Sequence, residues 1–309
     1  MEKLPLPPYT TDAFLNEANR LLKMDTGETM RILQKLFENR LITYHRTDST
    51  HVSDAGLEIA RFYLKEHFVG RKWQGKEEGA HECIRPTRAI DWRTLRELIR
   101  EGIIKTSDVI SYKDLKLYDL IFRRFMASQC PALRLLTVWY LLFLKDLKLT
   151  KEIERIVAVE GKAYELYPQI ILIEKPLPEG SQRGIILVKR VPKEPLLTQA
   201  DLIRLMKERR IGRPSTYSFL INRLFERGCV FERNSRLIPT KKGQKVAEYL
   251  LGKFPEFLSE QRSRLLEELI DEIERGEKDY FAVLKELYLE IQEIKKKRAT
   301  LVTNGEPLQ

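Results

Sequence analysis

Apolar residues recur at helical spacing through the first part of the chain. The first stretch follows Thr10, Thr11 and Asp12, which are candidate N-cap residues. It places five apolar residues on one helical face: Phe14, Leu15, Ala18, Leu21 and Leu22. Residues 28–39 repeat the pattern, and residues 41–47 ("LITYHRT") have the β-branched and aromatic composition of a short strand. Further helices are expected over 53–67, 92–101 and 115–128.

The pattern changes near Pro131. Up to about residue 192, runs of β-type residues separated by Gly-containing turns predict strands over 133–144, 155–166, 170–175 and 184–191. Helical spacing then returns. It predicts helices over 198–210, 218–228, 241–254 and 259–297, with a strand pair at 229–240.

Helix, helix and strand, with a further helix, is the outline of a winged helix-turn-helix, a common DNA-docking unit. The outline occurs twice, first in the N-terminal region and again from about residue 198 with its own wing. The sequence therefore predicts an α+β multidomain fold, with two winged-helix-like helical units joined by a β-rich segment. The expected boundaries are 1–130, 131–195 and 196–309.

Charge and composition narrow the classes of partner. The 309 residues carry a net charge of +10, which favours a polyanion such as nucleic acid. No run of about 18 apolar residues and no signal peptide is present, which argues against a membrane partner. Three distant cysteines without a CxxC pair argue against a zinc ribbon and fit a reducing cytoplasm, so a cytoplasmic location is expected. Abundant Lys, Arg and Glu with little Asn or Met suits a hyperthermophile.

The segment "TYHRTDST" concentrates reactive side chains around Tyr44. On a strand, Tyr44 and Arg46 would share a face. A guanidinium beside a phenol suits phosphoryl transfer to tyrosine, because it stabilises both the phenolate and charge on the phosphate oxygens. The alternative from these residues alone is a half-buried β tyrosine flanked by ordinary surface charges.

Two further segments combine basic and hydroxyl side chains. "GAHECIRPTR" contains His81, Glu82, Arg85 and Thr87, and a histidine near a basic residue can bind phosphate or shuttle a proton. "IGRPSTY" places Arg213, Ser215 and Thr216 at a predicted helix start, where backbone N–H groups favour phosphate. Taken singly, the first is also consistent with a polar loop and the second with simple helix capping.

In order and spacing, these three segments resemble the motifs of type IA DNA topoisomerases. "LYDLIFRRFMASQ" (117–129), "IPTKKG" (238–243) and the tail residues Glu267, Ile270, Asp271, Ile273 and Gly276 extend the resemblance over essentially the whole chain. His45 after the tyrosine, the opening "PPYTTD" and "GAHECIRPTRAID" look most like the topoisomerase module of reverse gyrase.

The resemblance implies a role for each motif. Tyr44 would be the nucleophile that forms a 5′-phosphotyrosyl link and later releases it, Arg46 would position it, and His81 would assist at the DNA backbone. The remaining matched residues would contact DNA: Thr47, Asp48, Ser49, Glu82, Arg85, Thr87, Arg213, Ser215 and Thr216. The three segments would be a tyrosine domain, a β-rich arch segment and a helical base segment.

The family also uses a Toprim domain with a catalytic glutamate and a Mg²⁺-binding Asp-x-Asp cluster. No DxDxE pattern occurs here, and no GxxxxGK[ST] loop of a helicase module occurs either. We therefore expect a partial enzyme, whose Mg²⁺ is held by a Toprim-bearing segment or chain. Expected partners are single-stranded DNA, duplex with unpaired regions, that Toprim segment and a helicase-like ATPase module.

Two non-enzymatic alternatives remain. A DNA-binding module of two winged helices would use the +10 charge and bind DNA without cutting it. The other alternative is a protein-interaction scaffold with a basic surface. The combination of Tyr44, Arg46, His81 and the Arg-Pro-Ser-Thr loop favours the enzyme, because a pure binding module has no need for all of them.

Overall fold

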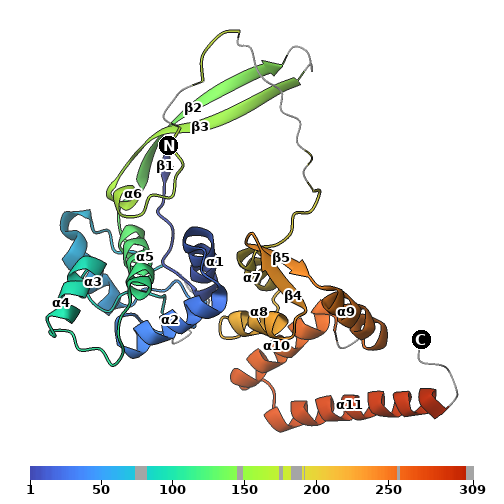
Figure 1. The fold of residues 1–309 in the computed structure, drawn as a ribbon. Helices are drawn as coiled ribbons and strands as arrows, with labels where there is room; N and C mark the ends of the chain where they lie inside the picture. Colours follow the sequence, from blue (N-terminus) through green and yellow to red (C-terminus); the bar gives the residue numbers. More distant parts are fainter. Residues whose placement is uncertain are drawn as a thin grey trace. The chain divides into compact units, whose positions relative to one another are not determined.

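The computed structural model describes residues 1–73, 82–144, 149–173, 177–181, 190, 192–255 and 258–303. Its described residues form a mixed α+β fold (Figure 1). The chain divides into two compact units, one comprising 1–204 with 214–240 and the other comprising 205–213 with 241–309. The three boundaries expected from the sequence stay a prediction.

The N-terminal helices of the first unit surround one central helix, α5 (Tyr112–Ser128), which contacts α2, α3, α4 and α6. The surrounding elements are α1 (Thr11–Leu22), α2 (Thr26–Glu38), α3 (Asp54–Leu64), the 3₁₀ turn η1 (Lys65–His67) and α4 (Trp92–Arg100). The core residues Phe14, Leu33, Leu117, Ile121 and Phe125 are fully buried. Burial of these side chains is the main force that holds the helices together.

Capping side chains set where these helices begin. Asp25 accepts from Glu28 N at 2.8 Å at the start of α2, and Asp91 accepts from Thr94 N at 2.8 Å at the start of α4. Ser111 and Asp114 form a reciprocal capping box at α5. Thr10 occupies the N-cap position of α1 without a side-chain cap.

The strand predicted over 41–47 does not form a ladder. The segment is extended, but its strand-like pairing is limited to an isolated bridge between Ile42 and Pro86. Proline has no N–H with which to continue the pairing.

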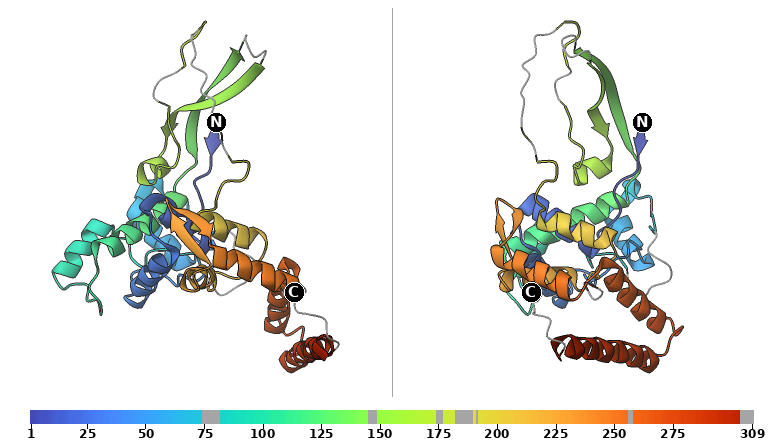
Figure 2. Two further views of the ribbon diagram at one scale, coloured as in Figure 1. Left: turned by 45° about the vertical axis from the view of Figure 1, so that its right-hand side comes forward. Right: turned by 90° about the vertical axis from the view of Figure 1, so that its right-hand side faces the viewer.

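The three-stranded sheet has the order β1-β2-β3, and all its pairs are antiparallel. Its strands are β1 (Glu2–Lys3), β2 (Leu133–Leu144) and β3 (Leu149–Glu160), and Figure 2 shows β2 and β3 side by side in both views. The register of β2 and β3 shifts between Leu136 and Thr137. The predicted strand 133–144 is confirmed.

The other three predicted strands are not confirmed over their full lengths. Residues 155–160 belong to β3, but 162–166 form the short helix α6 (Lys162–Leu166), so the strand predicted there was wrong. Gly161 between them has φ +134°, a conformation that ends an L-residue strand. Residues 170–173 are not a strand, and 184–191 lie outside the described residues except for Arg190.

Downstream, α7 (Gln199–Glu208), α8 (Tyr217–Glu226) and the hairpin β4 (Val230–Arg233) and β5 (Arg236–Pro239) match the expected order. Asn234 and Ser235 form the two-residue turn of the hairpin with φ of 51° and 57°. Positive φ at both positions matches the twist of the flanking strands.

The second unit contains α9 (Lys241–Lys253), α10 (Glu260–Glu274) and α11 (Tyr280–Thr303). The single helix predicted over 259–297 is in fact two helices. Gly276 adopts φ +73° after the C-cap residue Arg275, which ends α10, and Asp279 then accepts from Ala282 N at 2.8 Å to begin α11.

Candidate functional site

Tyr44 lies on an extended segment whose side chains alternate between solvent and core. Tyr44, Arg46 and Asp48 are exposed, whereas His45, Thr47 and Ser49 are buried. Alternation of this kind is what an extended backbone imposes on its side chains. Tyr44 and Arg46 therefore share the solvent side, as the sequence predicted, although no ladder forms there.

The buried side of this segment is fastened to the start of α1. Thr11 Oγ1 donates to the carbonyl oxygen of His45 at 2.6 Å and accepts from Thr47 N at 2.8 Å. Thr11 N also donates to Thr47 O at 2.8 Å. These bonds hold the backbone on the C-terminal side of Tyr44, so they restrict where its side chain can point.

Aromatic contacts position the Tyr44 ring itself. Phe37 of α2 packs edge-to-face against it, with ring centroids 5.4 Å apart and planes at 68°. The ring stays 40% exposed, so it is supported from within and accessible from outside.

His45 is fully buried, and neither of its ring nitrogens has a hydrogen-bond partner among the described residues. Its ring lies 5.7 Å from that of Tyr44 and 6.0 Å from that of Phe37. Burial, with the nearby positive charge of Arg46, lowers the pKa of His45 to about 4. The imidazole is therefore neutral at pH 7 and acts as packing beneath the tyrosine.

The segments around Tyr44 and Arg85 come together in space. Thr43 Oγ1 donates to Cys83 O at 2.8 Å and accepts from Arg85 N at 3.0 Å. Thr43 N in turn donates to Arg85 O at 2.9 Å. Two of the three sequence motifs thus form one contiguous polar site.

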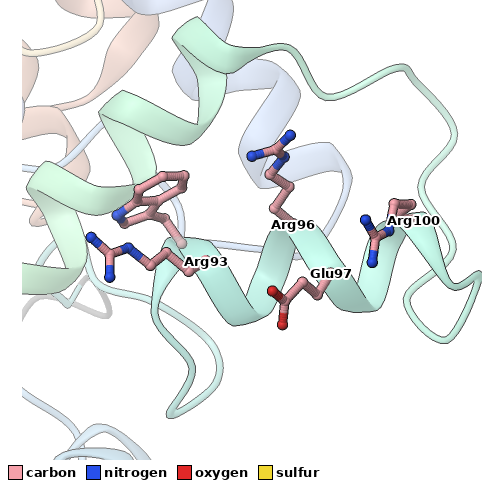
Figure 3. Close-up of a pocket in the computed structure, with 5 residues that line it drawn as sticks. Arg93, Arg96, Glu97 and Arg100 are labelled. Atoms are coloured by element: carbon pink, nitrogen blue, oxygen red, sulfur yellow. The ribbon is translucent and has the colours of Figure 1, made fainter.

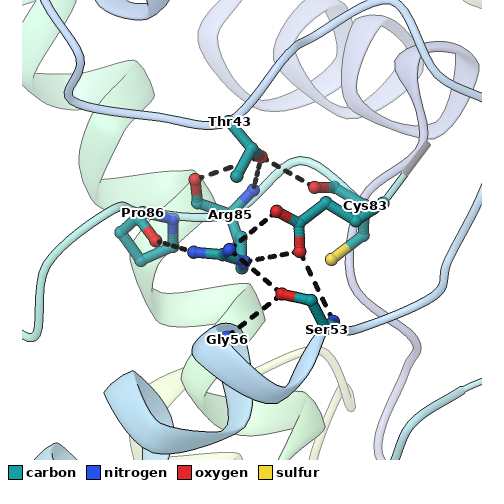
Figure 4. A network of polar contacts seen from close by, with 7 residues as sticks. Thr43, Ser53, Gly56, Cys83, Arg85 and Pro86 are labelled. Carbon is teal, nitrogen blue, oxygen red and sulfur yellow. Dashed lines mark hydrogen bonds and ion pairs between the residues drawn. The ribbon is translucent and has the colours of Figure 1, made fainter. Parts of the chain in front are cut away.

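A network centred on Arg85 braces this junction (Figure 4). The buried guanidinium donates to Glu82 through Nε (2.9 Å) and Nη2 (2.6 Å), to Pro86 O (3.0 Å) and to Ser53 Oγ (3.3 Å). Ser53 Oγ also caps α3 by accepting from Gly56 N. Burial alone would raise the pKa of Glu82, but hydrogen bonds from Arg85 and Ser53 outweigh burial and lower it. Glu82 and Arg85 are therefore engaged with each other and with α3.

Three other predicted DNA contacts are also tied into this framework. Thr47 Oγ1 accepts from Ser49 N at 3.0 Å, and Ser49 Oγ accepts from His51 N at 3.0 Å, so these two hydroxyls stabilise successive turns of backbone. Thr87 Oγ1 donates to Arg40 O at 2.6 Å. His81 lies outside the described residues.

The third motif spans the boundary between the two units. Within the second unit, Arg213 donates to the carboxylates of Glu267 and Asp271 and to Glu267 O at 2.9 Å. Burial would lower the pKa of Arg213, but the hydrogen bonds to Glu267 and Asp271 outweigh it and raise the pKa. Within the first unit, Ser215 is exposed and Thr216 is the residue before α8.

Several of these supporting residues were not identified from the sequence. Thr11 was interpreted only as a capping candidate, although it binds the Tyr44 segment 34 to 36 positions away. Phe37 was assigned to a helix face, and Ser53 carried no signal beyond starting a helix. The partners of Arg213 had been noted only as matched tail residues, without a contact being inferred.

No group of three or more His, Cys, Asp or Glu side chains in the described part of the chain is arranged to hold a metal ion. The described residues therefore offer no Mg²⁺ site of their own. Among the described helices, none has both the length and the apolar character to cross a membrane.

Comparison with known proteins places this chain in a family. The family model for DNA topoisomerase matches residues 1–285. A reverse gyrase from Pyrococcus furiosus is 46% identical over 303 residues, which cover 93% of this chain and 24% of the relative. Reverse gyrase 2 from Aquifex aeolicus is 44% identical over 296 residues, covering 93% and 25%.

A solved structure of full-length topoisomerase I from Thermotoga maritima has a similar fold. Its TM-score is 0.73 at 29% identity, covering 95% of this chain and 50% of that one. The chain belongs to the type IA DNA topoisomerase family. Within it, the chain resembles reverse gyrases and spans about a quarter of the length of the reverse gyrases it matches.

Proposed function

We propose that this chain is the strand-cutting part of a reverse-gyrase-like type IA topoisomerase, with Tyr44 as its nucleophile. The observation that carries the proposal is the geometry around Tyr44. An accessible phenol shares the solvent side of an immobilised segment with Arg46, while the residues between and beyond them are buried.

The proposed reaction is a reversible transesterification. The Tyr44 phenolic oxygen forms a bond to a backbone phosphorus and loses its proton, and the bond from phosphorus to the 3′ oxygen breaks. The 3′ oxygen leaves as a protonated hydroxyl, and the 5′ phosphate stays on the tyrosine. Reversal by the 3′ hydroxyl reseals the strand after strand passage, so neither step consumes ATP.

Arg46 is proposed to bind the scissile phosphate, because its exposed guanidinium stabilises charge that builds on the phosphate oxygens. Asp48, Ser215 and Thr216 are proposed to contact DNA, and His81 to assist at the backbone. Glu82 and Arg85, which bind each other, are proposed to act through positioning. Arg213, which is held by Glu267 and Asp271, is also proposed to contact DNA.

The remaining machinery is proposed to come from elsewhere. A Toprim-bearing segment or chain would supply the acid–base glutamate and hold Mg²⁺, which contributes positive charge near the phosphate. A helicase-like ATPase module is a proposed further partner. The α7, α8 and β4–β5 elements are proposed to dock DNA as a winged helix.

Covalent capture tests this proposal. The chain is mixed with end-labelled single-stranded DNA and Mg²⁺, with and without a Toprim-bearing segment of a type IA topoisomerase, and then denatured. We expect a protein–DNA adduct that requires both the Toprim segment and Tyr44, and that is lost in Tyr44→Phe. Salt-sensitive binding without an adduct would instead support the DNA-binding module.

A further inference from the structure

An arginine-rich face of α4 plays no part in the site described above. Arg93, Arg96 and Arg100 line a pocket of 280 Å³ together with Trp92 and Glu97 (Figure 3). All three arginines are exposed. Positions 93, 96 and 100 follow the i, i+3, i+7 spacing that brings residues to one helical face.

These arginines are not tied into the fold by ion pairs between described residues. No carboxylate of a described residue lies within 4.0 Å of the guanidinium groups of Arg93, Arg96 or Arg100. By contrast, Arg85 and Arg124 are buried against carboxylates. Glu97 is the one carboxylate among the residues that line the pocket, so this lining is net positive.

The arginine-rich face points to solvent because the opposite face of α4 is buried. Leu95 is fully buried against the helical core, and α4 packs on α5. Asp91 caps the first turn, and Tyr118 OH donates to Ile90 O at 2.8 Å just before it. The helix is anchored by these contacts, so its outer face can change without unfolding it.

Aromatic rings adjoin the arginines. Arg93 lies over the Trp92 ring at 5.6 Å, and Trp92 packs edge-to-face with Tyr112, at 6.4 Å between centroids. Tyr112 is 61% exposed, and Lys116 lies over its ring at 4.8 Å. Cations beside exposed aromatic rings are the combination that binds single-stranded nucleic acid, through phosphate pairing and base stacking.

We propose that this face is a second DNA-binding site: Arg93, Arg96 and Arg100 bind successive phosphates of a single strand, and Trp92 and Tyr112 stack on its bases. From Arg93 to Arg100 the helix rises about 10 Å, at about 1.5 Å per residue. That length corresponds to about three nucleotide spacings of about 3.4 Å each, so the three side chains cover a run of about four phosphates. The inference rests on the proposed function, which brings a DNA strand to this unit, but it assigns that strand a site on α4 separate from Tyr44.

The test compares two triple variants of the full chain with the same loss of charge. One is Arg93→Gln, Arg96→Gln and Arg100→Gln. The control is Arg20→Gln, Arg204→Gln and Arg275→Gln, which removes three exposed arginines that pair with Glu17, Asp201 and Glu277. Circular dichroism checks that both fold. Binding to fluorescein-labelled dT20 is measured by anisotropy over a range of KCl concentrations.

We expect the α4 variant to bind at least about tenfold more weakly, with a log–log salt slope smaller by about 2, since each phosphate contact on a single strand contributes about 0.7. The control variant should change affinity by less than about twofold. Equal losses in both variants would mean that only overall charge matters, and would overturn the proposal.

A second readout separates this inference from the proposed function. At saturating dT20 and with the Toprim segment present, the α4 variant should still form the Tyr44 adduct. Unchanged DNA binding by the α4 variant, with the adduct intact, would overturn the α4 site and leave the cleavage role standing. Unchanged DNA binding with lost association of the Toprim segment would assign the face to a protein and equally overturn the proposal. No DNA binding and no adduct by the parent chain would overturn both.

Discussion

Around Tyr44, the backbone is held by one threonine hydroxyl. Thr11 Oγ1 bonds both the carbonyl oxygen of His45 and the N–H of Thr47, on either side of Arg46. A buried backbone N–H that loses its partner costs about 1–3 kcal/mol. The position of Tyr44 and Arg46, the proposed catalytic pair, therefore depends on a residue of another element, α1.

Thr11→Val removes these bonds and keeps the side-chain volume. We expect a loss of about 1–3 kcal/mol in the free energy of unfolding, and a slower rate of adduct formation with little change in DNA affinity. Urea titration and single-turnover capture measure the two effects. Thr11→Ser should restore the rate, and an unchanged rate in Thr11→Val would contradict the positioning role.

His45 makes stability depend on pH. Its pKa is about 4 in the folded chain, mainly because of burial, against an ordinary 6.5 when unfolded. Between pH 4 and pH 6.5 the unfolded state binds a proton at His45 that the folded state does not. The contribution of neutral His45 to the free energy of unfolding is therefore fully present above pH 6.5 and is lost progressively as the pH drops towards 4. The slope is at most about 1.4 kcal/mol per pH unit.

His45→Leu removes this proton uptake without breaking a hydrogen bond to a described residue. We expect the stability of the variant, relative to the parent, to rise steadily as pH falls from 7 to 4.5 in urea titrations. If the free energies of unfolding of the two proteins changed in parallel with pH over that range, His45 would not be buried as a neutral ring.

At the scale of elements, one glutamine joins the N-terminal helices to the later part of the first unit. Gln199 at the start of α7 accepts from Thr26 N (3.1 Å) and Thr26 Oγ1 (2.9 Å), and donates to Glu232 of β4 at 2.6 Å. Gln199 is 2% exposed and Thr26 fully buried. The start of α2 thus depends on a residue 173 positions away.

Gln199→Leu leaves the buried donors of Thr26 without their acceptor. We expect it to lower the free energy of unfolding by about 2–3 kcal/mol. In hydrogen exchange, the protection of backbone amides should fall at the start of α2, whereas the protection of amides in α5 should not change. Gln199→Glu, which keeps the acceptor, should retain more of the protection at Thr26. Equal protection at α2 in Gln199→Leu and the parent would contradict this link.

Elements whose signals are local could be predicted from the sequence. Most of the helices, β2 and the β4–β5 hairpin follow from periodicity, caps and turn residues within a few positions. Two errors came where distant contacts decide the conformation: 41–47 is held by Thr11 and Arg85 rather than by a ladder, and 162–166 is a helix packed against α5. A third error, one helix over 259–297, overlooked the local signals at Gly276 and Asp279 that end α10 and begin α11. Tyr44 and Arg46 were found from side-chain chemistry, whereas their supports, Thr11 and Phe37, lie in other elements and left no local signal.

For the molecule as a whole, the β2–β3 hairpin presents an apolar surface. Trp139, Leu141 and Phe143 alternate along β2 and are 62%, 53% and 69% exposed. Contiguous exposed apolar side chains favour association with other surfaces. We therefore expect these side chains to associate with another apolar surface, including that of a second copy of the chain.

Trp139→Lys with Phe143→Lys should reduce self-association of the isolated chain. We expect light scattering after size exclusion to show larger species for the parent at high concentration and a monomer for the variant, with helical content unchanged. The matched variant Glu152→Gln with Glu154→Gln raises the net charge by the same two units, on β3, without removing apolar surface. A monodisperse parent would contradict the expectation.

Mapping the adduct shows whether the cleaved strand is carried by Tyr44. Adduct formed with the Toprim segment is digested with nuclease and trypsin, and its peptides are sequenced by mass spectrometry. We predict a nucleotide on the phenolic oxygen of Tyr44, joined through its 5′ phosphate. A nucleotide on another residue, or a 3′-phosphate link, would contradict the assignment.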